Sequence, residues 1–227
     1  MSQTALNLVA IGIFLITLTS LLGPLVHVSP AVPAIATATL LGLAALDNFG
    51  WQGQGTILFV DWFAQRSPAH RDRVVHHEAG HFLVAHLLDI PVTGYALSAW
   101  DAFKQGNPGQ GGVVFNCPEL EAELQQGKLS AALLDRYCKI WMAGIAAEQL
   151  VYRNTEGGAD DRRILRQVLA QLKRSAAEAG VKEREAIRQA KTLLETHWSA
   201  YEALVMAMKA GEAVEACDRI IKATIND

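Results

Sequence analysis

The first 46 residues contain no charged side chain, and this feature constrains the fold more than any other. All 20 Lys and Arg residues and all 23 Asp and Glu residues follow Leu46. A membrane-spanning helix needs about 20 apolar residues, so the segment is too long for one span and suits two. Prolines at 24, 30 and 33 separate "LNLVAIGIFLITLTSLLGPLV" from "AVPAIATATLLGLAALD". We therefore expect a transmembrane helical hairpin over residues 1–47.

Two other interpretations of this segment exist. A cleaved signal peptide begins with positive charge, which "MSQTALN" lacks. One span followed by a re-entrant piece stays open as an alternative. The first basic residues, Arg66, Arg71 and Arg73, follow the second span, and basic residues mark the cytoplasmic side. We expect an integral protein of a plasma or thylakoid-type membrane, with its C-terminal part on the cytoplasmic or stromal side.

Residues 48–66 are expected to form an interfacial linker between the hairpin and a domain over residues 67–227. Their Gly and Gln residues suit a joint, and Trp51, Trp62 and Phe63 suit the aromatic belt at a membrane surface. The stretch "ILFVDWF" fits a core segment equally well.

Composition excludes some classes of partner. The net charge of -3 gives no electrostatic basis for binding nucleic acid. The three cysteines have no ligand-like spacing, so we expect ordinary reduced thiols.

The sequence "HHEAGH" contains the pattern HExxH on an expected helix over residues 67–89. This helix opens with a Ser–Pro pair, in which Ser caps the end and the missing N–H of Pro costs nothing. His77 and His81 are one turn apart on the same face, so both imidazoles can bind one zinc ion. Glu78 is rotated by about 100° and can instead act as a general base toward water.

A catalytic zinc keeps three protein ligands and one open position, so a third ligand is required. In "NTEGGADDRRILRQVLAQL" a Gly-rich turn carries two aspartates into a helix. Asp161 is in register with the apolar face of that helix, and Asp160 fits less well. Such a carboxylate is either a helix cap or a ligand that points inward. Glu148, in the otherwise apolar "WMAGIAAEQLVY", is a further candidate, or a structural carboxylate. The apolar face comprises Leu165, Val168, Leu169 and Leu172.

Together, "HHEAGHFLVAHLL", "MAGIAAEQLVY" and "EGGADD" resemble the peptidase domain of the FtsH-type membrane zinc metalloproteases. The resemblance covers about residues 67–227, including "QAKTLLETHWSAYEALVMAM", and the family also has two N-terminal spans. It implies a mainly α fold, in which the transmembrane hairpin precedes an α-helical HExxH zinc peptidase domain with a small β-sheet. It further implies zinc ligation by His77, His81 and Asp161, catalysis by Glu78, and a role for Glu148 in orienting ligands.

The chain also departs from that family. FtsH proteins carry an AAA+ ATPase between membrane and peptidase, whereas here only the linker occupies that place and no G-x-x-x-x-G-K-[ST] occurs. Ala143 and Ile145 replace a Gly and an Arg of the family pattern, and the spacing of "GGADD" leaves Asp160 as an alternative ligand. Residues 91–116 should supply two short strands, one of which could pair with an extended substrate. Their loop, 101–110, is either a flap or a connection.

These observations predict a membrane-anchored, ATP-independent zinc metalloendopeptidase that acts on flexible or unfolded proteins, membrane proteins among them. The expected partners are a polypeptide substrate, the lipid bilayer, and either further copies of the chain or an FtsH-type ATPase.

Two other classes of function are considered. The first is a non-catalytic adaptor or assembly factor that works with full-length FtsH-type proteases. The second is an intramembrane protease, which carries HExxH inside a spanning helix. Against the second, charged residues at 71–73 precede the motif, Asp89 follows it, and the apolar segment between them is too short to span a membrane.

Overall fold

The computed structural model describes residues 3–51, 53–106 and 111–226, and these divide into two compact units. The first unit comprises Met1–Ser67 with Ser98–Gly111, and the second comprises Pro68–Leu97 with Gly112–Asp227. The expectation of a mainly helical chain with a small sheet is confirmed.

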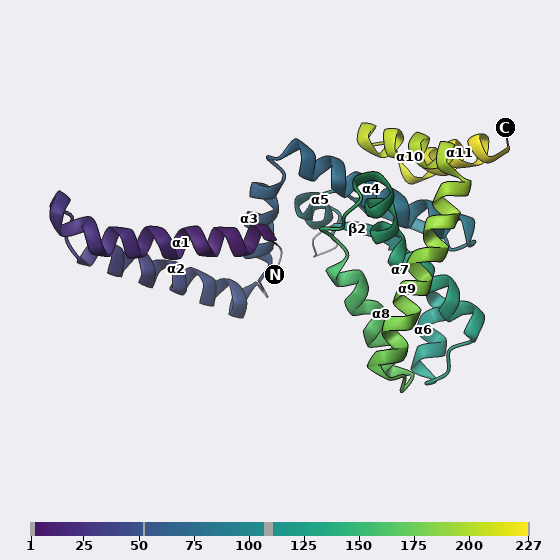
Figure 1. Ribbon diagram of the computed structural model, residues 1–227, viewed down its shortest axis with the longest axis horizontal. Coiled ribbons are helices and arrows are strands. Elements are labelled where there is room, and N and C mark those ends of the chain that lie inside the picture. The colour runs from purple at the N-terminus through teal and green to yellow at the C-terminus, as the bar shows by residue number, and fades with distance from the viewer. Residues whose placement is uncertain (1–2, 52, 107–110, 227) are drawn as a thin grey trace. The chain divides into compact units, whose positions relative to one another are not determined.

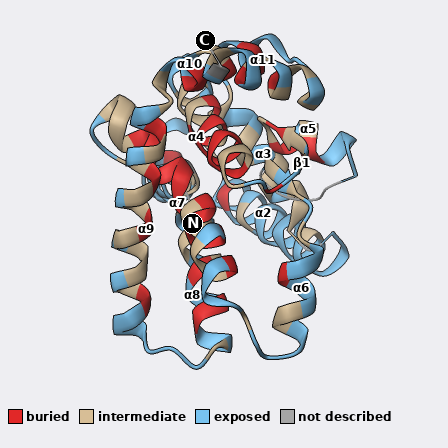
Figure 2. Cartoon of the chain, turned by 90° about the vertical axis from the view of Figure 1, so that its right-hand side faces the viewer, coloured by how far each residue is buried: buried red, intermediate tan, exposed pale blue. Residues whose placement is uncertain are grey.

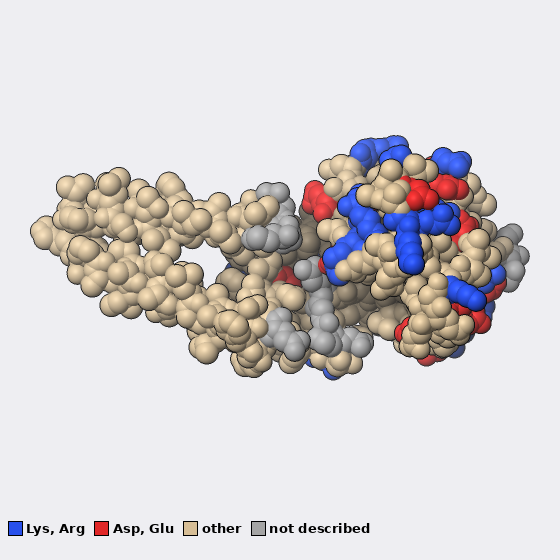
Figure 3. Space-filling view, turned by 90° about the horizontal axis from the view of Figure 1, so that it is seen from below, with Lys and Arg blue, Asp and Glu red and all other residues tan. Residues whose placement is uncertain are grey.

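The first unit begins with two apolar helices that run side by side, α1 (Gln3–Leu22) and α2 (Ala31–Gly50), joined by η1 (Gly23–Val26) (Figure 1). Both are long and apolar enough to cross a membrane, as the sequence predicts. Their large apolar side chains face outward, with Phe14 62% and Leu41 67% exposed. The face of this pair in Figure 3 shows no charged side chains. The outward exposure distinguishes these helices from the core helices of a water-soluble domain, which bury their apolar faces.

The residues expected as a linker contain a further helix, α3 (Gln54–Ala64). The Asp47 carboxylate near the end of α2 fixes the corner between the two helices. It accepts hydrogen bonds from the backbone N–H groups of Gly55 and Thr56, both at 2.8 Å, and from the Thr56 hydroxyl at 2.6 Å. The start of α3 is therefore tied to the end of α2.

The segment between the two expected strands also contains a helix, α5 (Ala99–Lys104), where a loop over 101–110 was expected. Ala99 and Ala102 are buried, and α5 packs against α3. The Asp61 carboxylate of α3 accepts a hydrogen bond of 2.9 Å from the Ala99 N–H. The last part of the expected loop, 107–110, lies outside the described residues.

The second unit combines a small antiparallel sheet with a helical core. Strands β1 (Val92–Ala96) and β2 (Gly112–Phe115) confirm the two expected strands, and a bulge between Val92 and Gly94 shifts their register. The expected helix over 67–89 is α4 (Pro68–Leu87), which starts at the expected proline. The other helices are α6 (Pro118–Gln125), α7 (Ala131–Tyr152), α8 (Ala159–Gln171), α9 (Ala176–Thr196), α10 (Trp198–Ala210) and α11 (Val214–Asn226).

The core of this unit is centred on α4 and α7, whose facing residues are almost all buried (Figure 2). The two helices approach closely because Gly80 lies where they meet. A Cβ atom added at Gly80 would lie 2.7 Å from the Ala143 carbonyl oxygen and 2.8 Å from the Ala147 Cβ. Such distances are well inside van der Waals contact. The glycine, unfavourable by about 1 kcal/mol within a helix, is therefore explained by close packing.

We predict that Gly80→Ala lowers the stability of the second unit by about 1–3 kcal/mol, because the added methyl forces α4 and α7 apart. Gly180→Ala is the matched control, since its Cβ would meet only the Arg184 guanidinium at 3.6 Å. That change should instead stabilise α9 by about 0.5–1 kcal/mol. Denaturant unfolding of the detergent-solubilised chain, followed by near-ultraviolet circular dichroism, measures both. Equal effects of the two substitutions would contradict the packing account.

Candidate metal centre

Helix α4 and the first turn of α8 bring three candidate ligands together. His77 and His81 are buried, and their Nε2 atoms lie 3.1 Å and 3.5 Å from the Asp161 carboxylate oxygens. One ligand atom from each residue lies within 4.8 Å of the other two. Two imidazoles and a carboxylate at this separation could hold a metal ion. The third ligand that the family resemblance implies, Asp161, is thus placed beside the two histidines.

Hydrogen bonds on the far side of each ring orient the histidines. His81 Nδ1 lies 2.7 Å from the Ile140 carbonyl oxygen, which can only accept, so this nitrogen carries the proton. His77 Nδ1 lies 2.8 Å from Glu148 Oε1 and donates to it in the same way. Both Nε2 atoms then face Asp161, which is the arrangement in which neutral imidazoles bind a metal. The donor set of this chain therefore fits a divalent cation.

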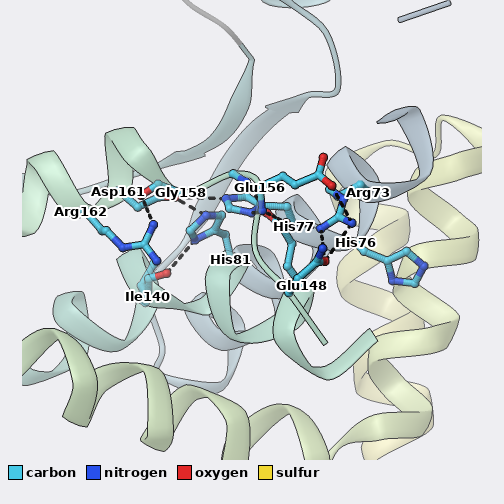
Figure 4. Close-up of polar contacts among 12 residues, drawn as sticks. Arg73, His76, His77, His81, Ile140, Glu148, Glu156, Gly158, Asp161 and Arg162 are labelled. Carbon is cyan, nitrogen blue, oxygen red and sulfur yellow. Dashed lines mark hydrogen bonds and ion pairs between the residues drawn. The ribbon is translucent and has the colours of Figure 1, made fainter. Parts of the chain in front are cut away.

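Glu148 is held by more groups than any other residue of the site (Figure 4). Its side chain is only 1% exposed and accepts from Arg73 at 2.8 Å and from the backbone N–H groups of Glu156 and Gly157 at 2.8 Å and 3.0 Å. Burial alone raises the pKa of this carboxyl, but the hydrogen bonds from His77, Glu156 and Arg73 outweigh burial and lower the pKa to about 2. The carboxylate is therefore ionised and immobile, which suits a group that orients His77.

The charges of the centre compensate one another. Burial lowers the pKa of His77, but the hydrogen bonds that its ring donates to Asp161 and Glu148 outweigh burial and raise the pKa to about 10. Burial raises the pKa of Asp161, but the neighbouring His81 and His77 hold it well below its usual range. A metal ion must displace the imidazole protons to bind here, so its affinity falls as the pH falls.

Glu78 lies next to β2 and contributes none of the three clustered ligand atoms. Its carboxylate accepts a hydrogen bond from the Val113 N–H, and a Cβ at Gly112 would lie 3.8 Å from Glu78 Oε2. Burial raises the pKa of this carboxyl, and the charges of His77 and His81 lower it only in part. A half-buried carboxylate beside a candidate metal centre can exchange a proton with a bound reactant.

The other ligand candidates lie elsewhere. Asp160 is exposed and pairs with Arg163 at 3.0 Å and 3.1 Å, so it is not part of the cluster. Glu148 contacts the Nδ1 atom of His77, on the opposite side of the ring from Asp161. Leu165, Val168 and Leu169 are buried as expected, and this burial turns Asp161 inward.

Histidines outside the motif have partners of their own. His76 Nδ1 lies 2.9 Å from the Tyr201 hydroxyl, and His86 Nδ1 lies 2.9 Å from the Asp218 carboxylate. Both therefore have structural partners outside the cluster.

Three features of the site were not identified from the sequence: Arg73, the Ile140 carbonyl and Gly144. A Cβ at Gly144 would lie 2.3 Å from His77 Nε2, so only glycine leaves room for the imidazole. Spacing offers a signal for two of them, because Arg73 precedes His77 by one helical turn and Gly144 precedes Glu148 by one. The carbonyl leaves no signal in the sequence.

No model of a known protein family matches this chain, and no curated protein matches it significantly in sequence. The geometry of the centre therefore carries the functional argument.

We predict that Asp161→Asn removes stoichiometric metal whereas Asp160→Asn retains it, because only Asp161 faces the histidines. Glu148→Gln should lower metal affinity by about 10- to 100-fold, the usual effect of a group that orients a ligand. Elemental analysis of the purified chain after dialysis, combined with titration against a chelating dye, measures both quantities. Equal metal content in the two aspartate variants would contradict the assignment, and complete loss in Glu148→Gln alone would give the ligand role to Glu148.

Proposed function

We propose that this chain is a membrane-anchored zinc metalloendopeptidase of the FtsH type. The observation that carries the proposal is the convergence of His77, His81 and Asp161, with the Glu78 carboxylate beside the first ligand on the same helix. Three nitrogen and oxygen ligands are typical of catalytic zinc sites, because structural sites take four. The HExxH pattern and the resemblance of "AEQLVY" and "EGGADD" to the family support the same reading.

The protein groups divide the chemistry among them. A zinc ion held by His77, His81 and Asp161 would supply a Lewis acid for the peptide carbonyl and would lower the pKa of water. Glu78 takes the proton of the attacking water on a carboxylate oxygen and returns it to the nitrogen of the leaving amine. Glu148, itself fixed by Arg73, keeps the Nε2 atom of His77 directed at the centre.

The substrate we propose is an extended, flexible polypeptide. Strand β2 borders the carboxylate of Glu78 through Val113, so backbone groups of a substrate laid along this sheet would come near the reacting groups. Only an unfolded segment can pair with a strand in this way. No G-x-x-x-x-G-K-[ST] occurs in the chain, and we therefore propose cleavage without ATP, of loops, tails or unfolded membrane proteins.

Helices α1 and α2 are proposed to span the bilayer and to hold the second unit at the cytoplasmic or stromal surface. Arg66, Arg71 and Arg73 follow α2 in the chain and support this orientation. Assembly with further copies, or with an ATPase that delivers substrate, is compatible with this arrangement.

Glu78→Gln is expected to lower peptidase activity strongly while metal content and fold persist. Gln has nearly the same shape and can still accept the Val113 N–H, but it cannot take up the proton of water. Cleavage of an unstructured protein labelled with a fluorophore and quencher should fall by about 10²- to 10⁴-fold.

The control is metal content, which Glu78→Gln should leave unchanged because Glu78 is not a proposed ligand. A metal-loaded wild type that cleaves no flexible substrate, and whose cellular phenotype Glu78→Gln reproduces, would favour the adaptor function instead.

Residues 1–50 are expected to make membrane attachment resistant to alkaline carbonate. A shortened chain that begins at Gln54 keeps α3 and its packing against α5 but lacks both apolar helices. Immunoblots of carbonate-washed membranes should find the full chain in the pellet and the shortened chain in the supernatant. Release of the full chain would show that α1 and α2 do not span.

A further inference from the structure

The first unit exposes an unusual number of aromatic side chains outside α1 and α2. Within the part of the chain that the structure describes, every strongly exposed Phe or Trp belongs to this unit. The second unit exposes no large aromatic side chain to a comparable degree among its described residues. Those of α3 and α5 are Phe59, Trp62, Phe63, Trp100 and Phe103, each 45–58% exposed. We call these five residues the aromatic surface.

Local geometry presents the aromatic surface outward from both helices. Phe59, Trp62 and Phe63 recur at helical spacing along one stripe of α3, and the rings of Phe59 and Trp62 stack at 6.2 Å. On α5 the small residues face α3, so the larger Trp100 and Phe103 rings point away and stack on each other at 5.8 Å. Neither helix buries these rings against the described chain. Apolar surface of this extent is costly to expose to water.

Basic side chains accompany both aromatic pairs. The Arg66 guanidinium lies 3.9 Å from the centre of the Trp62 ring, and the Lys104 ammonium lies 5.6 Å from the centre of the Trp100 ring. Aromatic rings with cations over their faces match the headgroup layer of a bilayer, where rings meet the acyl boundary and cations meet phosphate.

We propose that α3 and α5 lie in the headgroup layer of the bilayer that α1 and α2 are proposed to span. Lipid is the expected partner of the aromatic surface because α3 is continuous with α2. Helix α3 begins four residues after α2 ends, and the Asp47 hydrogen bonds fix the corner between them. The two helices, of 11 and 6 residues, are too short to cross the bilayer themselves. This inference rests on the spanning hairpin of the proposed function.

Quenching of tryptophan fluorescence by brominated lipids tests the position of α5. The full chain is reconstituted into phosphatidylcholine vesicles with a minority of phosphatidylglycerol, with and without lipids brominated near the glycerol end of the acyl chain. Three of the five tryptophans, at 51, 62 and 100, belong to the first unit. Trp100→Phe keeps an aromatic ring and should remove roughly a third of the quenchable emission.

Trp198→Phe is the matched control, since Trp198 is partly buried against Tyr201 in the second unit. It should lower total emission and leave the quenchable part unchanged. Undiminished quenching in Trp100→Phe overturns the inference, whether α5 is then in water or covered by protein. Carbonate washing of the same vesicles separates the two proposals. Retained protein with unquenched Trp100 contradicts only the inference about α5, whereas released protein contradicts the spanning hairpin and this inference with it.

Discussion

The close approach of α4 and α7 is the constraint on which the candidate metal centre depends. Gly80 lets the backbones meet, and Gly144 leaves space for the His77 ring. At that separation α7 places the Ile140 carbonyl against one histidine of α4 and the Glu148 carboxylate against the other. Both imidazoles are thereby held with the same nitrogen facing α8. A looser pair of helices would retain the histidine spacing and lose the orientation that makes it useful.

Buried charge is the second constraint. Arg73, His77, His81, Glu148 and Asp161 would each be costly to bury alone, and their arrangement in contact offsets that cost. Glu148 is satisfied by a guanidinium and two backbone N–H groups before it bonds His77. The Asp161 carboxylate faces the two rings and is partly exposed. The net charge of the centre therefore depends on whether a cation or a proton lies between His77, His81 and Asp161.

The sequence predicted features with a local period and missed those that depend on long-range packing. The two apolar stretches predicted α1 and α2. The four-residue spacing of His77 and His81 predicted that both lie on one face of α4. Asp161 is in register with the apolar face of α8, which predicted that its side chain points inward. The same local sequence was also compatible with a helix cap. The Ile140 carbonyl and the proximity of Gly144 to His77 arise only when α7 docks on α4. For α5 a local signal did exist, since Ser98 caps the helix by accepting the Asp101 N–H and donating to its carboxylate.

The contacts that define the centre join residues far apart in the chain, and this has a consequence for the order of folding. His81 meets Ile140 across 59 residues, His77 meets Glu148 across 71, and His77 meets Asp161 across 84. Loops of this length close late, after local helices have formed and docked. A nascent or partly unfolded chain therefore has the motif without the oriented ligands. Under the proposed function, late assembly would leave the chain most vulnerable to cleavage at the stage when its own centre is not yet formed.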